Sequence, residues 1–518
     1  MLHLALVGVV TIVVNLRSKC LILRTLKNNL QTRRNFPLRG HLHFFYFFSE
    51  ICDFFCLPPD YLKVLINKGK SKKNKLKIDS QLFVNQYSKD ISCSIEECFS
   101  TDILDELATK TGFVSRCRKL TGPGFVNTLM FSSYSQMKTS LPDYTEDLAK
   151  NFGISMSREA LHKKFNPKAV EFMKEVLKLQ ISKQFKLAEN EGLRSCFQAV
   201  NIKDSSKFSL PTNYDNHYPG FGNFSKKNGL MNLQYEYDLL SGNWISLELT
   251  TIKRNDQQDS KETIDKIAKG ALYVRDLGYI TPIYLKAVLD KEAYFLNRLP
   301  AQISVYDLKG QPIDWKKTDR KFNKTNVSSM EMEVKIYEKE RLVCRLIIER
   351  VGEEEYRKRL DKAAKSAKSR GVGISDAHKL RCRYNTFITN VAKEVLPFEK
   401  ARKTYYLRWQ IELVFKTWKS FFEINQVKKV KKERMECQLL AKLIWIVLNW
   451  RLFQTCNNHL RIMKAETGMS TIKFFKRCLK FSESLRKVVM KILSIENWLI
   501  EEFLPLIDYA FCEAPKKK

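Results

Sequence analysis

The chain has 518 residues, enough for roughly two to four domains, and carries 90 lysines and arginines against 56 acidic residues, a formal net charge of +34. A hydrophobic share of 44% and a charged share of 28% are those of a globular protein and argue against a disordered or membrane-spanning chain. The positive charge predicts a polyanionic partner, with nucleic acid favoured over a membrane surface.

Cysteine usage indicates the compartment. The chain has 13 cysteines, an odd number, and no Cys-x-x-Cys pair. Cys52 and Cys56 lack a second pair of ligands at zinc spacing, so we expect neither a disulfide scaffold nor a structural zinc site. The cysteines indicate reduced thiols and a cytoplasmic, nucleoid-associated protein.

The first 80 residues do not resemble the rest of the chain. Residues 2–16 are apolar but shorter than the ~20 residues that a membrane span needs, and residues 68–77 contain six lysines. We expect residues 1–80 to be a leader outside the working fold, with residues 1 to about 75 read from a misplaced start. No membrane association is expected.

Residues 81–190 have helical periodicity and are predicted to form a DNA-binding domain. Within it, a short helix at Tyr144–Phe152, a turn at Gly153 and a second helix at Ser157–Phe165 have helix-turn-helix spacing. An ordinary helical hairpin in a core explains this spacing equally well. The second helix carries three candidate DNA-binding cations: Arg158, Lys163 and Lys164.

Residues 191–284 predict the first part of a catalytic core. Three strands are followed by a helix and a fourth strand, an order that fits a ribonuclease H-like α/β fold with a mixed sheet and flanking helices. Asp204 follows the first predicted strand, and Asp276 follows the fourth. The predicted elements are Phe197–Ile202, Leu230–Leu239, Trp244–Ile252, the helix Glu262–Lys269 and Leu272–Arg275.

The remaining sequence predicts an insertion into the catalytic core, the second part of that core and a C-terminal region. Residues 285–383 indicate a mostly β insertion that ends in a charged helix at Glu353–Arg370, since the interval after Asp276 is longer than one strand and one helix require. Residues 384–430 supply the second part of the core. Residues 431–518 predict a helical C-terminal region with a core helix at Leu439–Phe453. The second core part contains a strand at Tyr384–Val391 and a helix at Phe398–Phe422.

One face of this last helix is chemically unusual. Tyr405, Arg408, Glu412 and Lys419 stand at offsets 0, 3, 7 and 14 and fall within roughly 60° of arc on one helix. Taken alone, the pattern is explained equally well by a surface ion pair of Glu412 with Arg408 or with Lys416.

The spacing Tyr-x2-Arg-x3-Glu-x6-Lys resembles the YREK signature of the DDE transposases of insertion-sequence family four. The resemblance extends over residues 100–460 and includes the segments around Asp204 and Asp276, although Leu277 stands where many relatives have arginine. It implies that Asp204, Asp276 and Glu412 are the catalytic, metal-binding carboxylates. It also implies that Tyr405, Arg408, Lys416 and Lys419 contact the DNA ends.

The three carboxylates suit phosphodiester chemistry. An all-oxygen site favours two Mg²⁺ or Mn²⁺ ions over zinc, and we expect Asp204 to bridge both ions. Each aspartate alone could instead be a turn residue. Three other carboxylates near predicted strands would compete if the strand register were different: Asp215, Asp238 and Glu248.

We therefore expect a DNA transposase that binds double-stranded DNA at transposon ends and target, cleaves and transfers strands, and works as a homodimer. The resemblance further implies a hairpin intermediate. Two alternatives are a ribonuclease H-like nuclease without joining activity and a DNA-binding relic that has lost activity. A membrane-associated basic protein is the third.

Overall fold

The computed structural model of the chain describes residues 78–115, 119–133, 139–183, 193, 195–220, 229–300, 303–325, 327–369, 371–463 and 469–507. The predicted leader lies outside these residues up to position 77.

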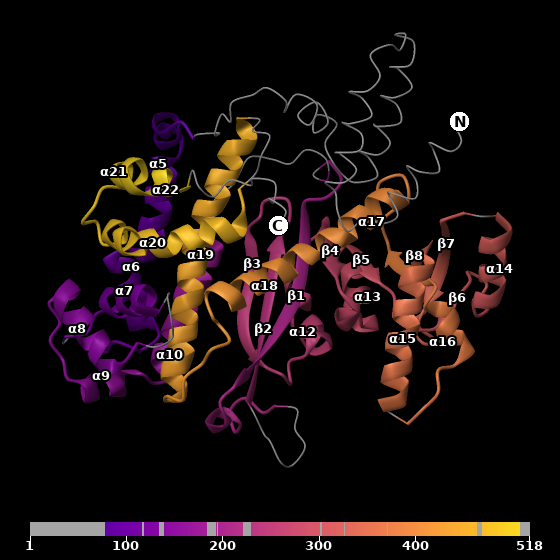
Figure 1. The fold of residues 1–518 in the computed structure, drawn as a ribbon, viewed down its shortest axis with the longest axis horizontal. Helices are drawn as coiled ribbons and strands as arrows, with labels where there is room; N and C mark the ends of the chain where they lie inside the picture. Colours follow the sequence, from indigo (N-terminus) through magenta and orange to yellow (C-terminus); the bar gives the residue numbers. More distant parts are fainter. Residues whose placement is uncertain are drawn as a thin grey trace, which may run out of the picture. The chain divides into compact units, whose positions relative to one another are not determined.

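A nine-stranded mixed sheet runs through the described chain (Figure 1). Its first five strands have the order β3-β2-β1-β4-β5, with β1–β2 and β2–β3 antiparallel and β1–β4 and β4–β5 parallel. This arrangement, with helices on both faces, fits the predicted ribonuclease H-like core. In sheet order the strands are β3 (Trp244–Thr251), β2 (Gly229–Asp238), β1 (Ala199–Leu210), β4 (Ala271–Arg275), β5 (Tyr294–Arg298), β9 (Tyr384–Thr389), β8 (Leu342–Arg350), β7 (Ser329–Ile336) and β6 (Val305–Tyr306).

The sequence predicted the first four strands near their observed positions, but two details were wrong. β1 continues to Leu210, so Asp204 lies inside the strand instead of following it. The helix expected at Glu262–Lys269 lies earlier, as α12 (Asp256–Glu262), and is followed by a short 3-10 turn. The cap explains the shift, because the Asn255 side chain accepts the backbone N–H of Gln258 and starts the helix there.

The two faces of the sheet have different cores. On one face, Val200, Ile202, Leu272 and Val274 pack in the same cluster as the helices α17 (Phe398–Leu407) and α18 (Trp409–Phe421). On the other face, Ala271 and Tyr273 pack with α13 (Pro282–Asp290). Side chains alternate along a strand, so residues one position apart in β1 and β4 face different helices.

The long helix predicted at Phe398–Phe422 is interrupted. α17 ends at Leu407 and α18 begins at Trp409, with Arg408 between them. The Arg408 N–H donates to the Tyr405 carbonyl, three residues back, instead of the four of an α-helix. The helical pattern correctly predicted the direction of the chain, and the local tightening turns the side chain of Arg408.

Within residues 285–383 the chain extends the same sheet. β5 is parallel to β4, and β6, β7 and β8 continue as antiparallel strands. β9 follows this region in sequence and lies between β5 and β8. The helices here are α14 (Trp315–Thr325), α15 (Glu353–Ser369) and α16 (Asp376–Arg381), and α15 confirms the predicted charged helix.

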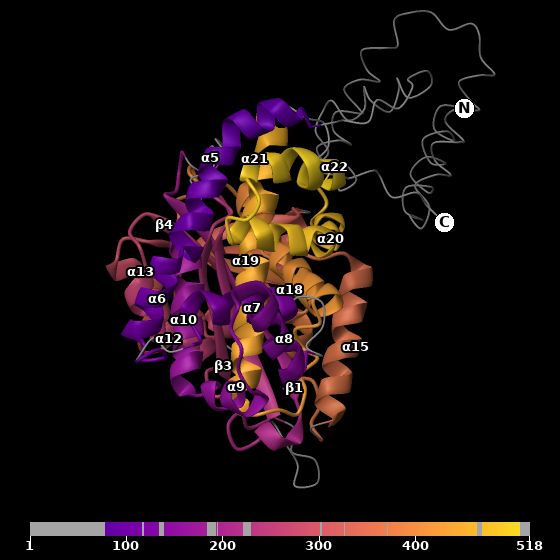
Figure 2. The same ribbon diagram turned by 90° about the vertical axis from the view of Figure 1, so that its left-hand side faces the viewer.

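Helices from both ends of the described chain form one helical body (Figures 1 and 2). The long helix α19 (Lys432–Ile462) runs through it and contains the buried stretch predicted as a core helix. The other members are α5 (Ser80–Phe99), α6 (Thr101–Lys110), α7 (Gly122–Ser133), α8 (Leu141–Phe152), α9 (Arg158–Lys164), α10 (Pro167–Ser182), α20 (Thr471–Val489), α21 (Ile495–Trp498) and α22 (Leu504–Ile507).

Polar contacts join the early helices to the late ones. Arg451 of α19 donates to the Ser94 hydroxyl of α5 at 2.8 Å, and Gln438 donates to the Tyr144 hydroxyl of α8 at 3.0 Å. Arg486 of α20 pairs with Asp147 of α8 through both guanidinium nitrogens. Across the described part of the chain, no helix is both long and apolar enough to cross a membrane.

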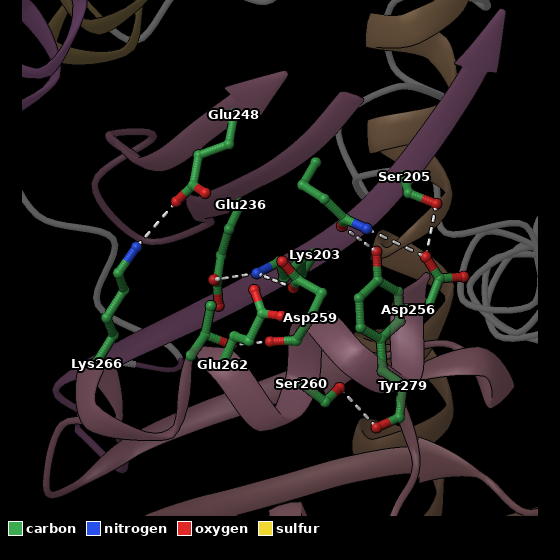
Figure 3. A network of polar contacts seen from close by, with 12 residues as sticks. Lys203, Ser205, Glu236, Glu248, Asp256, Asp259, Ser260, Glu262, Lys266 and Tyr279 are labelled. Atoms are coloured by element: carbon green, nitrogen blue, oxygen red, sulfur yellow. Dashed lines mark hydrogen bonds and ion pairs between the residues drawn. The ribbon is translucent and has the colours of Figure 1, made fainter. Parts of the chain in front are cut away.

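A buried ion network lies between β1, β2, β4 and α12 (Figure 3). Lys203 pairs with Asp259 and lies 3.6 Å from Glu236, while Arg275 donates to Glu236 at 3.1 Å. All four side chains are almost completely buried. A charge withdrawn from water in this way is tolerated only when its partner is present.

Replacing Asp259 by asparagine should therefore destabilise the fold, since it leaves Lys203 with one distant carboxylate. We expect the free energy of unfolding, measured by urea denaturation, to fall by about 3 to 5 kcal/mol. The matched control Asp265→Asn, at an exposed position in the following turn, should change it by less than about 0.5 kcal/mol. Equal effects of the two substitutions would show that the network does not contribute to stability.

Candidate active site

Asp204 lies on β1 with its side chain toward α18. Lys203 and Ser205, its neighbours along the strand, contact α12 on the opposite face. The Oδ1 of Asp204 accepts the backbone N–H of Ser205 at 2.8 Å, and its Oδ2 accepts Nη1 of Arg408 at 2.8 Å. The strand thus extends an apolar row, Val200 and Ile202, into a carboxylate.

Asp276 directly follows β4 and starts a 3-10 turn, Leu277–Tyr279. Because β1 and β4 are parallel with Lys203 paired to Arg275, the next residue of each strand is an aspartate at the same end of the sheet. The hydroxyl of Tyr405 donates to Oδ1 of Asp276 at 3.1 Å. The pairing of the two strands therefore sets the neighbourhood of the two aspartates.

Glu412 lies in the first turn of α18 and is exposed. Its Oε1 accepts Nη2 of Arg408 at 2.8 Å, so one guanidinium joins Glu412 to Asp204. Tyr405, one turn before Arg408, reaches Asp276. Arg408 and Tyr405 thus connect three carboxylates that are far apart in the sequence.

Burial and neighbouring negative charges raise the pKa values of two groups in this cluster, Asp204 and Tyr405. Burial raises the pKa of Asp204 to about 6 against the lowering effect of Arg408, and the charges of Asp276 and Asp256 raise it further. Burial, followed by the charge of Asp276, raises the pKa of Tyr405. Asp204 therefore gains from any cation that neutralises it.

The donor set is all oxygen, which is what a hard divalent ion requires. Among the described residues, however, no three carboxylate, histidine or cysteine side chains are gathered closely enough to hold a metal ion. Instead the guanidinium of Arg408 lies between Asp204 and Glu412. The donor set therefore suits a divalent ion in its chemistry, while in this arrangement the Arg408 guanidinium neutralises Asp204 and Glu412.

Two further predicted DNA contacts lie on α18. Lys416 is exposed. Nζ of Lys419 donates to the backbone carbonyl of Lys207 in β1 at 2.9 Å, and burial lowers its pKa. Lys419 thus fastens the end of α18 to the strand that carries Asp204.

The predicted helix-turn-helix is present as α8 and α9, with Gly153 in the left-handed conformation between them. Arg158 and Lys163 are exposed on α9. Lys164 lies over the ring of Phe113 at 5.9 Å. The three cations belong to the helical body and make no recorded contact with the carboxylate cluster.

The competing carboxylates have structural roles of their own. Asp238 accepts the backbone N–H groups of Val200, Leu240 and Ser241 and organises the turn after β2. Glu248 is paired with Arg254 and Lys266. Asp215 accepts the backbone N–H of Gly220 at 3.4 Å. These contacts explain the three residues without a catalytic role.

Sequence reasoning missed the residues behind the cluster. Lys203 and Arg275 each precede one of the aspartates, and a cation inside an apolar strand is the signal that could have identified them. Asp256 was also missed, although the α12 cap at Asn255 marks its position.

Comparison with known proteins identifies the family of this chain. Residues 196–448 match the family model described as a transposase DDE domain. The transposase of insertion sequence element IS231F from Bacillus thuringiensis subsp. israelensis is 32% identical over 68% of this chain and 78% of the relative. The chain belongs to the DDE transposases of insertion sequences. As the resemblance predicted, this transposase is a DNA-cleaving and strand-transferring enzyme.

The transposase of IS1151 from Clostridium perfringens is 28% identical over 79% of this chain and 89% of its own length. A cryo-EM structure of a piggyBac transposase synaptic complex with hairpin DNA aligns with 84% of this chain and 87% of that chain, at 10% identity and a TM-score of 0.38. The family assignment depends on the sequence relatives alone.

The raised pKa of Asp204 gives a testable effect of pH on the stability of the metal-free transposase. The folded-state pKa, about 6, lies above the unfolded value of 3.8, so the favourable contribution is complete below pH 3.8 and is lost as the pH rises through 6. Asp204→Asn stays neutral. Its free energy of unfolding in EDTA should exceed that of the wild type by about 1 to 3 kcal/mol at pH 7.5.

At pH 3 this difference should nearly vanish, because Asp204 is then largely protonated in both the folded and the unfolded state. Urea denaturation at the two pH values measures it. A variant that is less stable than the wild type at pH 7.5 would contradict the electrostatic account.

Proposed function

We propose that Asp204, Asp276 and Glu412 are the catalytic carboxylates and that together they hold two Mg²⁺ or Mn²⁺ ions. The observation that carries the proposal is the convergence of the three on Arg408 and Tyr405, from a strand, a strand end and a helix. The aspartates are on neighbouring parallel strands and the glutamate is on the helix that covers them.

The reaction we propose is hydrolysis followed by transesterification. Bound divalent ions would stabilise the charge that develops on the attacking and leaving oxygens. The carboxylates of Asp204, Asp276 and Glu412 supply the negative charge that retains the ions, and the apolar face beneath them limits water to the open side. Water is the first nucleophile, and the 3′ hydroxyl that it frees at the transposon end is the second.

We propose that Arg408 binds the carboxylates in the absence of DNA and a DNA phosphate in its presence. Without DNA it neutralises Asp204 and Glu412. When DNA is bound, its guanidinium is free to contact a phosphate of the transposon end, since arginine and phosphate form bidentate, charge-assisted hydrogen bonds. Tyr405, Lys416 and Lys419 complete the proposed contact surface on the same helical segment.

Recognition of the terminal repeats is assigned to residues 81–190. The turn at Gly153 and the exposed cations Arg158 and Lys163 support α9 as a DNA-contacting helix, with Lys164 beside them. We further propose that the strands within residues 285–383 position the flanking DNA while the end passes through a hairpin intermediate.

We propose that the transposase acts as a homodimer on paired ends and target DNA. The buried stretch Leu439–Phe453 packs inside the helical body, so it is not available to a second copy. A dimer contact among residues 438–505 would therefore use the outward faces of α19 to α22.

The decisive experiment is cleavage and joining of a DNA fragment that carries the element's own ends, with Mg²⁺, by wild type and Glu412→Gln. We expect the variant to lose both activities by more than about a hundredfold, which exceeds what substitutions outside the ligand set usually cost. End binding, measured by gel shift, should remain.

Three other outcomes would replace this account. Cleavage without joining by the wild type would favour a nuclease. End binding without metal-dependent cleavage by either protein would favour a DNA-binding relic. Unchanged activity in Glu412→Gln would remove this residue from the catalytic set.

The proposed role of α9 predicts a change in salt dependence. Arg158→Ala and Lys163→Ala should each weaken end binding and lower the slope of log affinity against log salt by about 0.9, the value expected for one lost phosphate contact. The control Lys174→Ala removes an exposed α10 lysine paired with Glu171 and should leave the slope unchanged. An effect as large in the control would indicate general charge instead of a contact.

A further inference from the structure

Helix α12 contacts β1 through Lys203 and Ser205, the residues on either side of Asp204 (Figure 3). Asp256 accepts the hydroxyl of Ser205 at 2.7 Å, and Asp259 pairs with Lys203. Two carboxylates one helical turn apart thus contact two strand residues on one face. Asp204, between those two residues, points the other way.

The same helix also contacts the segment that carries Asp276. Ser260 donates to the backbone carbonyl of Tyr279 at 2.8 Å. Asp256 accepts the Gln234 amide at 3.3 Å, and Gln234 in turn accepts the Tyr279 hydroxyl at 2.8 Å. Hydrogen bonds from α12 and β2 therefore reach both catalytic segments.

Asp256 fits closely against the turn after Asp276. A Cβ atom placed on Gly278 would lie 2.8 Å from Oδ2 of Asp256, so a larger residue there would displace the Asp256 carboxylate. Asp256 thus contacts the chain one residue beyond Asp204, through Ser205, and approaches it two residues beyond Asp276.

We propose that Asp256 is a positioning residue that sets the spacing between Asp204 and Asp276, and so the fit of the site to its divalent ions. This inference rests on the proposed function. Asp256 acts through Ser205 and the Gly278 turn, on the opposite side of β1, and does not itself bind metal. Asp259 contributes to the same clamp, but its complete burial makes it primarily a stability residue.

Asp256 offers a clean test because it is only half-buried and no ion pair of its side chain is recorded. Asp256→Ala removes the acceptor for Ser205 and Gln234. Asp256→Asn keeps an oxygen in the same place without the charge. The matched control is Asp265→Ala, at an exposed aspartate in the turn that follows α12.

Two quantities should be compared among the full-length proteins. One is the Mn²⁺ concentration that half-saturates end cleavage, and the other is the dissociation constant of Mn²⁺ from the DNA complex, measured by electron paramagnetic resonance. We expect Asp256→Ala to raise both about tenfold, as substitutions behind a metal site typically do. Asp256→Asn and Asp265→Ala should stay within about threefold of the wild type, and thermal unfolding should be nearly unchanged in all three.

Each other result has a definite meaning. Normal Mn²⁺ dependence in Asp256→Ala would overturn the proposal, and a defect in Asp256→Asn equal to that of alanine would make the carboxylate a direct ligand. If Asp256→Ala unfolds, Ser205→Ala removes only one hydroxyl, and a wild-type Mn²⁺ dependence in it would overturn the proposal as well. Absence of cleavage by the wild type would instead refute the proposed function, whatever the variants do.

Discussion

The parallel pairing of β1 with β4 is the constraint on which the proposed active site depends. It aligns Lys203 with Arg275 and therefore brings Asp204 and Asp276, the next residues, to the same end of the sheet. The alternation of side chains sends the two cations into the buried network and the two carboxylates toward Tyr405 of α17 and Arg408. The stability of the fold and the geometry of the proposed site thus come from neighbouring residues on opposite faces.

Arg408 is the counterpart of this constraint on the helical side. The break between α17 and α18 places its guanidinium against both Asp204 and Glu412. A cation in this position relieves the repulsion among neighbouring carboxylates. If these carboxylates are the catalytic set, as proposed, Arg408 keeps the metal-free site assembled and must move before the site can act.

Much of this architecture followed from the sequence because the signals were local. Strand alternation predicted β2, β3 and β4 closely, and the spacing of Tyr405, Arg408 and Glu412 predicted side chains that do converge. The continuation of β1 past Asp204 and the partners of Lys203 were not predictable, since they depend on contacts between segments distant in sequence. Asp256 belongs to this second class, because only the fold brings α12 behind β1. The start of α12 was missed for another reason, because its signal, the Asn255 cap, is local but was not used.

Helix α19 makes the helical body depend on segments that are far apart in the sequence. The interior of the helical body is shared between early and late segments of the described chain, through pairs such as Ser94 with Arg451 and Asp147 with Arg486. An N-terminal fragment would expose the apolar surface that α19 covers. The fold of α8 and α9 therefore depends on residues about 300 positions later in the sequence, so the helical body cannot be divided along the chain without opening its interior.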